Sequence, residues 1–278
     1  MSASDNISPT AHYTGEVWRR NGLSHPWLAT SEGRVMFDAL HPLMSVSGAV
    51  GGPSLETYLL ARHLAIDALL ERAVERQKVS QVVEIAAGMS PRGWRFANRY
   101  GDRLTYVETD LPVMAQRKRR ALARIGSLSD QHRVRDLDVL RENEPPDPEG
   151  LAGLVRELHP GRGLAIITEG LLGYLPTREV THLWERFARA LARFTTGLYI
   201  SDLHLGGATS GTVRVARIAL AAFVRGGVYF HFADAAEAEE RLRACGFATA
   251  TVRPAARLAE LPPASSRSTA HILEASTE

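Results

Sequence analysis

Four short stretches of the sequence place chemically active residue types directly after apolar runs. In the first, the β-branched run at 82–85 is followed by the small residues Ala86, Ala87 and Gly88, and then by Pro91, which can open a helix. Small residues let a backbone approach a ligand closely, and a helix N-terminus favours negative charge. This pattern indicates a nucleotide-type binding turn. A plain tight turn is the alternative, because Ala86 replaces the first glycine of a G-x-G-x-x-G fingerprint.

The second stretch ends in acidic residues. Residues 104–107 form a strand candidate that Glu108 and Asp110 follow, with Asp110 about 20 residues after Gly88. An acid at this strand end can accept hydrogen bonds from both ribose hydroxyls of an adenosine ligand. The alternative is that Asp110 caps the helix that begins at Pro112, and one carboxylate can do both.

The third and fourth stretches also end in polar residues. Residues 163–168 read as a buried strand leading into Glu169, whose carboxylate would face the same crevice as Gly88 and Asp110. Residues 197–204 end in Asp202 and His204, which point to one side of an extended strand because they are two positions apart. His204 could then be a base oriented by a nearby acid. The alternatives are a solvated strand end, a turn closed by Asp202 and a surface histidine.

Periodic apolar residues predict the elements that must position these side chains. Seven strands are expected, at residues 79–87, 104–107, 132–137, 163–168, 197–204, 247–252 and 269–273. Helices are expected at residues 54–77, 91–100, 112–125, 151–158, 177–193, 212–224 and 234–244, with Ser54 and Thr177 as the N-caps of the first and the fifth. This alternation implies right-handed βαβ units and a parallel sheet. The last two strands are a possible antiparallel pair, which does not follow from the alternation. Residues 1–12 are interpreted as a disordered lead, and residues 47–53 and 143–150 as loops.

Composition narrows the class of protein. The chain has 278 residues, 45% hydrophobic and 23% charged, as in an ordinary soluble globular protein. A formal net charge of +2 does not indicate general binding of nucleic acids or other polyanions. The basic run at 117–120 is interpreted as a solvated helix face, with an anion or nucleic-acid contact as the alternative. The single cysteine, Cys245, allows no disulfide framework and no thiolate metal site, so no metal is expected. The absence of a signal peptide or a membrane-spanning run favours a cytoplasmic protein without a membrane partner.

Three of the stretches, taken in order, resemble one family. The sequences EIAAGMSPRGWRF at 84–96, YVETDLPVMAQRKR at 106–119 and IITEGLLGYL at 166–175 are similar to the motifs of the leucine carboxyl methyltransferase family. That family includes bacterial relatives that methylate polyketide carboxyl groups. The resemblance runs from about Tyr13 to the C-terminus and is firm over 55–205. Two departures are Ala86, where the family often has glycine, and Ser90-Pro91, which replaces Asp-Thr.

The resemblance implies a fold, a cofactor and roles for residues. The fold is an α/β, Rossmann-like class I methyltransferase sheet of seven mostly parallel strands flanked by helices, with an N-terminal helical lid over 1–53 and a cofactor domain over 54–278. The cofactor is S-adenosyl-L-methionine. Arg62 would pair with its methionine carboxylate, a role for which arginine is suited; the alternative is an exposed helix arginine. The other implied cofactor residues are Ala86, Gly88, Asp110 for the ribose, Asp136 and Leu137 beside the adenine, and Glu169 near the amino-acid end.

The sequence says less about the group that accepts the methyl group and the residues that contact it. A carboxylate acceptor is ionised at neutral pH and needs no general base, whereas a phenol or an amine usually needs one. Tyr174, Asp202 and His204 are the candidate catalytic residues, and His231 is interpreted as a packed loop residue. The N-terminal residues expected to close over the substrate are Tyr13, Arg19, Arg20 and His25.

We therefore expect a methyltransferase that acts on the carboxylate of a small molecule. The alternatives are methylation of a phenolic hydroxyl or a nitrogen with His204 as base, a nicotinamide-dependent oxidoreductase, and a non-catalytic binding protein on a methyltransferase fold. The sequence makes no prediction about the oligomeric state.

Overall fold

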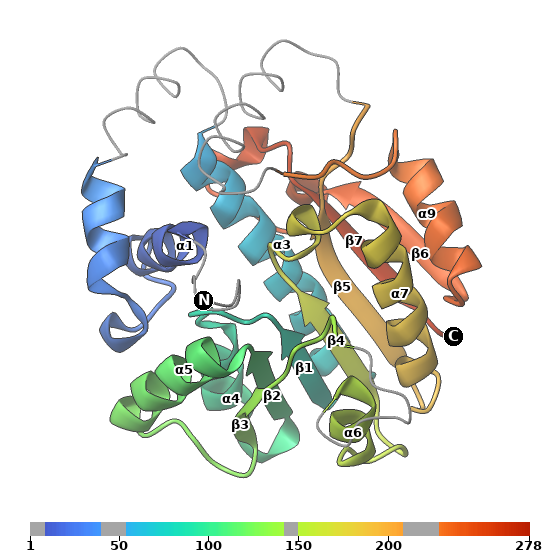
Figure 1. Ribbon diagram of the computed structural model, residues 1–278, viewed down its shortest axis with the longest axis horizontal. Coiled ribbons are helices and arrows are strands. Elements are labelled where there is room, and N and C mark those ends of the chain that lie inside the picture. The colour runs from blue at the N-terminus through green and yellow to red at the C-terminus, as the bar shows by residue number, and fades with distance from the viewer. Residues whose placement is uncertain (1–8, 40–53, 142–149, 208–227) are drawn as a thin grey trace.

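The computed structural model describes residues 9–39, 54–141, 150–207 and 228–278, and they are built around one seven-stranded sheet of order β3-β2-β1-β4-β5-β7-β6 (Figure 1). The strands β1 to β5 are parallel, and β7 is antiparallel to both β5 and β6. The predicted strands are thus confirmed, including the antiparallel last pair. Their bounds are Gln81–Ile85 (β1), Thr105–Asp110 (β2), His132–Asp136 (β3), Leu164–Thr168 (β4), Gly197–Leu203 (β5), Thr249–Pro254 (β6) and His271–Ser276 (β7).

The helices alternate with the strands along the chain, as predicted. Residues 31–39 are helical too. The predicted helix at 212–224, the loop at 47–53 and nearly all of the loop at 143–150 lie outside the described residues. The bounds are Pro9–Arg20 (α1), Leu55–Glu75 (α3), Arg92–Tyr100 (α4), Pro112–Ile125 (α5), Leu151–Arg156 (α6), Thr177–Leu191 (α7) and Ala235–Ala244 (α9).

Two sequence predictions about helix starts need correction. Helix α1 begins at Pro9, so residues 9–12 are not part of a disordered lead: the helix buries Tyr13 and Val17 against its neighbours. Thr177 is the first helical residue of α7 and does not cap it, because Pro176 occupies the N-cap position. The predicted cap at Ser54 is confirmed, since its side chain accepts a hydrogen bond from the backbone N–H of Thr57.

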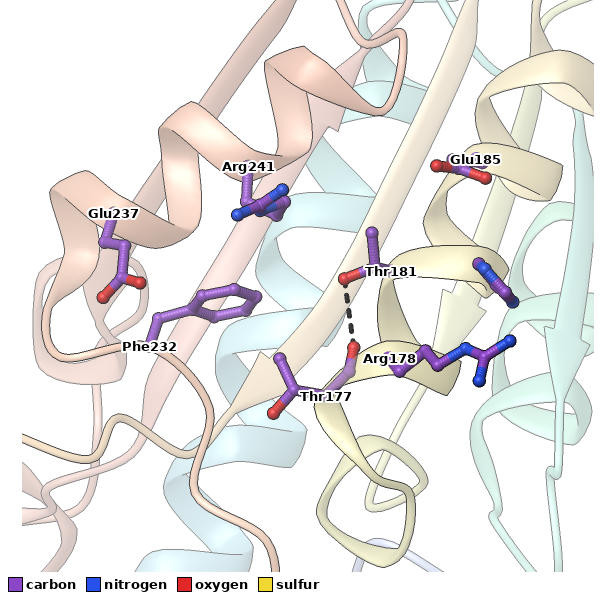
Figure 2. A pocket seen from close by; sticks show the side chains of 8 residues that line it. Thr177, Arg178, Thr181, Glu185, Phe232, Glu237 and Arg241 are labelled. Atoms are coloured by element: carbon purple, nitrogen blue, oxygen red, sulfur yellow. Dashed lines mark hydrogen bonds between the residues drawn. The ribbon is translucent and has the colours of Figure 1, made fainter.

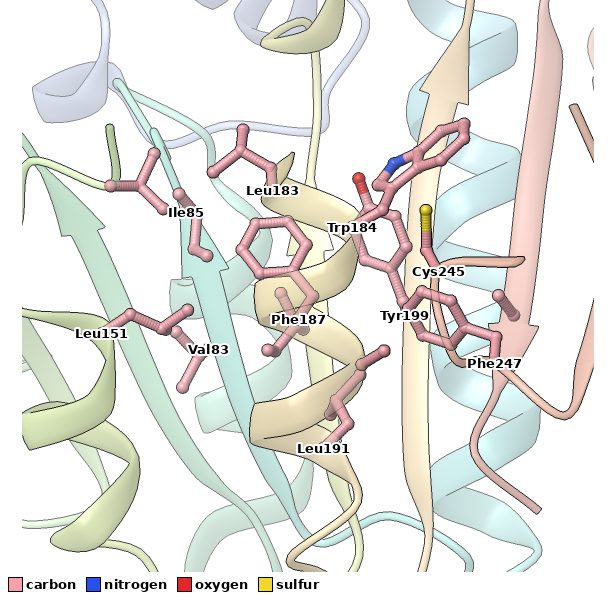
Figure 3. Close-up of a cluster of buried hydrophobic side chains, with 14 of the residues drawn as sticks. Val83, Ile85, Leu151, Leu183, Trp184, Phe187, Leu191, Tyr199, Cys245 and Phe247 are labelled. Carbon is pink, nitrogen blue, oxygen red and sulfur yellow. The ribbon is translucent and has the colours of Figure 1, made fainter. Parts of the chain in front are cut away.

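The two faces of the sheet are covered by different helices. Side chains of α6, α7 and α9 pack on one face, where Leu183, Phe187 and Leu191 project from α7 toward the strands (Figure 3). Helices α3 and α4 cover the other face, and α3 and α7 lie on opposite sides of the sheet (Figure 1). Because β1 and β2 are parallel with Glu84 opposite Glu108, these two carboxylates lie side by side on the α4 face.

The described N-terminal residues pack on helix α3. Tyr13 stacks on Phe37 with ring centroids 5.4 Å apart, and both belong to one buried cluster with Val17, Leu59 and Leu60. The role of residues 1–53 as a lid stays a prediction. No helix among the described residues is both long and apolar enough to cross a membrane.

Candidate functional site

The turn after β1 meets the end of β2, as the sequence pattern predicts. The backbone N–H of Gly88 donates to Asp110 Oδ2 over 2.7 Å, and the N–H of Leu111 donates to Asp110 Oδ1 over 2.8 Å. Burial raises the pKa of Asp110 to about 6, against the lowering effect of these two N–H donors. Asp110 thus both holds the turn and precedes helix α5, and its carboxylate lies where a ribose is expected.

The turn keeps a glycine-like backbone although Ala86 replaces a family glycine. Ala86 has φ +53° and Gly88 has φ +50°. A left-handed conformation costs an L-residue roughly 1–2 kcal/mol, so the surrounding contacts impose this conformation on Ala86. Ala86 thus holds a backbone conformation that glycine adopts without strain.

Arg62 is buried, so its alternative interpretation as an exposed helix arginine is wrong. Its side chain is about 9% exposed, its Nε donates to Glu169 Oε1 over 3.1 Å, and its Nη1 donates to Asp202 Oδ2 over 3.3 Å. Helix α3 thereby holds a guanidinium against the carboxyl ends of β4 and β5.

Gly170 is part of this arrangement, and sequence reasoning did not single it out. Its φ is +70°, and a Cβ there would lie 2.9 Å from Arg62 Nη2. Its N–H donates to Asp202 Oδ1 over 2.7 Å. A larger residue here would have to displace the guanidinium and adopt a left-handed backbone. The one available signal in the sequence was the glycine that follows Glu169 in the motif.

Three side chains contact the Glu169 carboxylate, and one of them is a second buried arginine, Arg92. Its Oε1 accepts from Arg62, while its Oε2 lies 2.6 Å from Arg92 Nη2 and 2.9 Å from His63 Nδ1. Burial alone would raise the pKa of Glu169, but its interactions with His63, Arg92 and Arg62 hold it below its ordinary value. The role of Glu169 as a cofactor contact stays a prediction, because its oxygens already have partners in the chain.

Arg92 is the centre of this charged cluster. It is completely buried and donates to Asp67 over 2.5 Å and to Glu84 over 2.7 Å, in addition to Glu169. Tyr106 adds a hydrogen bond to Glu84 over 2.7 Å. Neither Arg92 nor Asp67 has a role that the sequence alone predicted. The sequence held one signal for this cluster. Asp67 is an acid at a position of its helix where the apolar spacing predicts burial, so it indicates a buried partner of opposite charge.

His204 is not a surface histidine. Its Nε2 lies 2.9 Å from the hydroxyl of Tyr58, the two rings are stacked at 17°, and Phe230 meets the imidazole edge-on. Burial lowers the pKa of His204 to about 4, although Asp202 acts in the opposite direction. Asp202 itself bonds Gly170 and Arg62, so the side chain that orients the His204 ring through a hydrogen bond is Tyr58.

The other predicted site residues lie at the same edge of the sheet or next to it. Tyr174 is 36% exposed in the turn after β4. Asp136 is exposed and pairs with Arg119 over 2.8 Å. Leu137 is buried, and its N–H donates to the carbonyl of Asp110 over 2.9 Å. Their individual roles stay predictions.

The residues expected to close over a substrate contact the N-terminal segment and, at Tyr13 and His25, also helices α3 and α4. Arg19 and Arg20 both pair with Glu16, Tyr13 is buried, and His25 accepts from the N–H of Trp27. Whether they reach a substrate stays a prediction.

Two other residues need comment. His231 is buried between Thr177 Oγ1 and the carbonyl of Leu172, each 3.0 Å away, which matches its interpretation as a packed loop residue. Lys118 is 1% exposed, so the interpretation of residues 117–120 as a solvated face is wrong at this position. Lys118 lies on the inner side of α5, where Glu108 of β2 supplies a counter-charge.

A groove of about 390 Å³ lies elsewhere, between α7 and α9 (Figure 2). It is lined by side chains of both charges, including Arg178, Glu185, Glu237 and Arg241, and none of the predicted site residues lines it. Among the described residues, no group of three or more potential ligands is arranged to hold a metal ion.

The fold and the site together define a class I methyltransferase sheet, and comparisons with known proteins agree. The model of the leucine carboxyl methyltransferase family matches residues 28–188. The chain belongs to the leucine carboxyl methyltransferase family, whose cofactor is S-adenosylmethionine.

Similar proteins support this assignment. A Mycobacteroides abscessus protein assigned as an S-adenosyl-L-methionine-dependent methyltransferase is 35% identical over 131 residues, which are 46% of this chain and 38% of that protein. A Mycolicibacterium gilvum protein with the same assignment is 36% identical over 98 residues, 35% of this chain and 30% of that protein. The matches thus span well under half of these relatives. A crystal structure assigned as a methyltransferase from Thermobifida fusca has a TM-score of 0.64 at 14% identity, covering 95% of this chain and 93% of that one, and shows the fold alone.

The residues at the carboxyl edge fit the family's cofactor. A Cβ at Gly88 would meet no described atom within 4 Å, so the backbone is open on that side. Asp110 would hold the ribose, and the buried Leu137 would lie beside the adenine. Arg62, fixed by two carboxylates beside a glycine, would hold the methionine carboxylate.

Proposed function

We propose that the protein is an S-adenosylmethionine-dependent methyltransferase and that its acceptor is the carboxylate of a small molecule. The methyltransferase part is supported by the family and by the convergence of Gly88, Asp110 and Arg62 at one edge of the sheet. When bound, the cofactor supplies a methyl group on a positively charged sulfur. The chain's contribution is to align the acceptor and to exclude water.

The observation that carries the choice of acceptor is the state of His204. A useful general base has a pKa near the working pH, whereas burial lowers the pKa of His204 to about 4. Its Nε2 is also engaged with Tyr58, and a Cβ at Gly173 would lie only 3.0 Å from its Nδ1. A carboxylate acceptor is already ionised, so it needs no proton acceptor in this position.

The first experiment tests the cofactor. S-adenosylhomocysteine titrated by calorimetry is expected to bind with micromolar affinity. Asp110→Ala should weaken this binding tenfold or more, about 1.4 kcal/mol, because the ribose loses its carboxylate partner. Asp102→Ala is the matched control. It removes an exposed acid in the short turn between α4 and β2, at the other end of β2 from Asp110, and should change the affinity less than twofold. No binding by the wild type would favour the non-catalytic alternative.

A second experiment tests the acceptor. Transfer of labelled methyl groups from the cofactor is measured with a set of small carboxylic acids and a matched set of phenols and amines. Methyl esters are expected, with a rate at saturating cofactor that is flat between pH 7 and 8, above the pKa of Asp110. Methylation of phenols or amines, with a rate that rises with pH and is lost in His204→Asn, would establish the alternative instead.

A further inference from the structure

A second buried charged group lies under the cofactor-binding turn, next to the Arg92 cluster. It consists of Glu108 on β2, Lys118 on α5 and His132 on β3, each at most 1% exposed. The Lys118 ammonium contacts the Glu108 carboxylate, and His132 Nε2 lies 2.7 Å from Glu108 Oε1. None of these three side chains has a part in the methyl transfer described above.

Lys118 also reaches the turn itself. Its Nζ lies 3.4 Å from the carbonyl oxygen of Ala87, and the same oxygen accepts the N–H of Ser90 over 2.9 Å. Ala87 stands between Ala86 and Gly88, the two residues of this turn that have positive φ. A backbone with a left-handed alanine needs contacts that hold it there, and the side chain of Lys118 supplies one from another element.

The position of the lysine is defined from several sides. The Glu108 carboxylate packs closely on helix α4 at Gly93, where a Cβ would collide with it. Lysine carries up to three N–H donors, which allows one nitrogen to serve both the Glu108 carboxylate and the Ala87 carbonyl. Burial lowers the pKa of Lys118 to about 7, with Arg92 acting in the same direction and Glu84 against it. The nitrogen remains an N–H donor in either charge state.

Burial of a charged pair is not an efficient source of stability. An apolar pair of similar volume often stabilises a fold as well or better. The nitrogen of Lys118 points at a functional turn. Its burial is therefore better explained by its effect on the geometry of that turn than by a contribution to the free energy of unfolding.

We propose that Lys118 is a positioning residue for the cofactor-binding turn: held by Glu108, it fixes the Ala87 carbonyl and thereby the Gly88 N–H that donates to Asp110. The proposal rests on the proposed function, because the importance of the turn depends on the cofactor.

The test compares Lys118→Met, which keeps the length and loses the donor, with Lys118→Gln, which keeps an N–H donor without charge. Arg120→Met is the matched control, since Arg120 is an exposed cation two residues away on the same helix. We expect Lys118→Met to bind S-adenosylhomocysteine at least tenfold more weakly than wild type. Lys118→Gln should recover part of the loss, and Arg120→Met should bind within twofold of wild type.

Amide hydrogen exchange of the free protein gives a readout that needs no ligand. In Lys118→Met the N–H groups of Gly88 and Ser90 should exchange at least tenfold faster, while those in the centre of β4 stay protected. If Lys118→Met does not fold, Lys118→Gln replaces it in both measurements, with a smaller change of the same sign.

Unchanged affinity and unchanged exchange at Gly88 in a folded variant would overturn the proposal. Equal loss of protection throughout the sheet would also overturn it, because Lys118 would then act only on global stability. A wild type that does not bind S-adenosylhomocysteine would refute the proposed function, whereas the exchange of Gly88 would still decide the role of Lys118.

Discussion

The two faces of the sheet bury their side chains by different physical means. On the face covered by α6, α7 and α9, the large buried side chains are apolar, and Trp184, Phe187 and Leu191 are completely enclosed (Figure 3). On the face covered by α3, α4 and α5, Glu84 and Glu108 lie side by side on neighbouring strands. Each carboxylate has its own buried cation, Arg92 for Glu84 and Lys118 for Glu108.

This difference separates stability from positioning. Apolar burial is non-directional, and a core tolerates changes that keep its volume. A buried ion pair fixes the positions of both partners but is costly if one of them is lost. The charged face orients two groups. Glu169 holds the Arg62 guanidinium, and Lys118 contacts the turn at Gly88. We therefore expect changes on the two faces to affect stability and cofactor binding in different proportions.

The largest effect is expected at the centre of the charged face. Arg92→Met would leave Asp67, Glu84 and Glu169 buried without their shared counter-charge, which should lower the free energy of unfolding by about 3–5 kcal/mol. Cofactor affinity should fall too, because Glu169 would no longer be held beside Arg62. Urea unfolding measures the first effect, and calorimetry at a temperature where the variant is folded measures the second. A loss below about 1 kcal/mol would show that the network is dispensable.

The charged face should also make the fold sensitive to acid. Burial lowers the pKa of His132 to about 4 from its ordinary value of 6.5. An unfolded chain therefore binds the proton first, and the stability contributed by the neutral histidine is fully present above pH 6.5 and is lost as the pH falls toward 4. At about 1.4 kcal/mol per pKa unit, His132 would account for a loss of about 3 kcal/mol, and His204, with a pKa of about 4, acts in the same direction. Asp110, whose pKa burial raises to about 6, acts in the opposite direction, so the net loss is smaller than the sum for the two histidines. Urea midpoints between pH 7 and 4 measure this loss, and a constant midpoint would contradict it.

On the apolar face, the expected loss is in stability alone. Phe187→Leu removes part of a fully buried ring and should cost about 1–3 kcal/mol. S-adenosylhomocysteine affinity should stay within twofold of the wild type, and the stability difference should be the same at pH 7 and pH 5. A tenfold loss of affinity in this variant would break the distinction between the two faces.

The smallest effect concerns the strained turn. Ala86→Gly removes the left-handed alanine at φ +53°, a gain of roughly 1–2 kcal/mol that is largely offset by about 0.5–1 kcal/mol of backbone entropy. Thermal unfolding should show a slightly more stable protein. Ala188→Gly in the interior of α7 is the control of opposite sign and should destabilise by about 1 kcal/mol. Destabilisation by Ala86→Gly would mean that the methyl group of Ala86 matters more for packing than its backbone strain.

The alternation of apolar runs and helical spacing was sufficient to predict the seven strands, because the period of a sequence pattern depends on local geometry. The predictions for Gly88 and Asp110 came from the same source. Residues at the carboxyl ends of adjacent parallel strands must meet, and the two are joined by a hydrogen bond. Assigning Arg62 required the family resemblance, since an arginine in a helix gives no sign of its burial.

The pairing of charged side chains was decided only by the tertiary structure. Lys118 stands in a run of four basic residues and is buried, because α5 turns that residue toward Glu108. Tyr58 and His204 are 146 residues apart and meet within 2.9 Å, and Arg92 gathers acids from α3, β1 and the end of β4. Sequence periodicity determines which face of an element is buried, whereas the partner of a buried charge depends on how the elements pack.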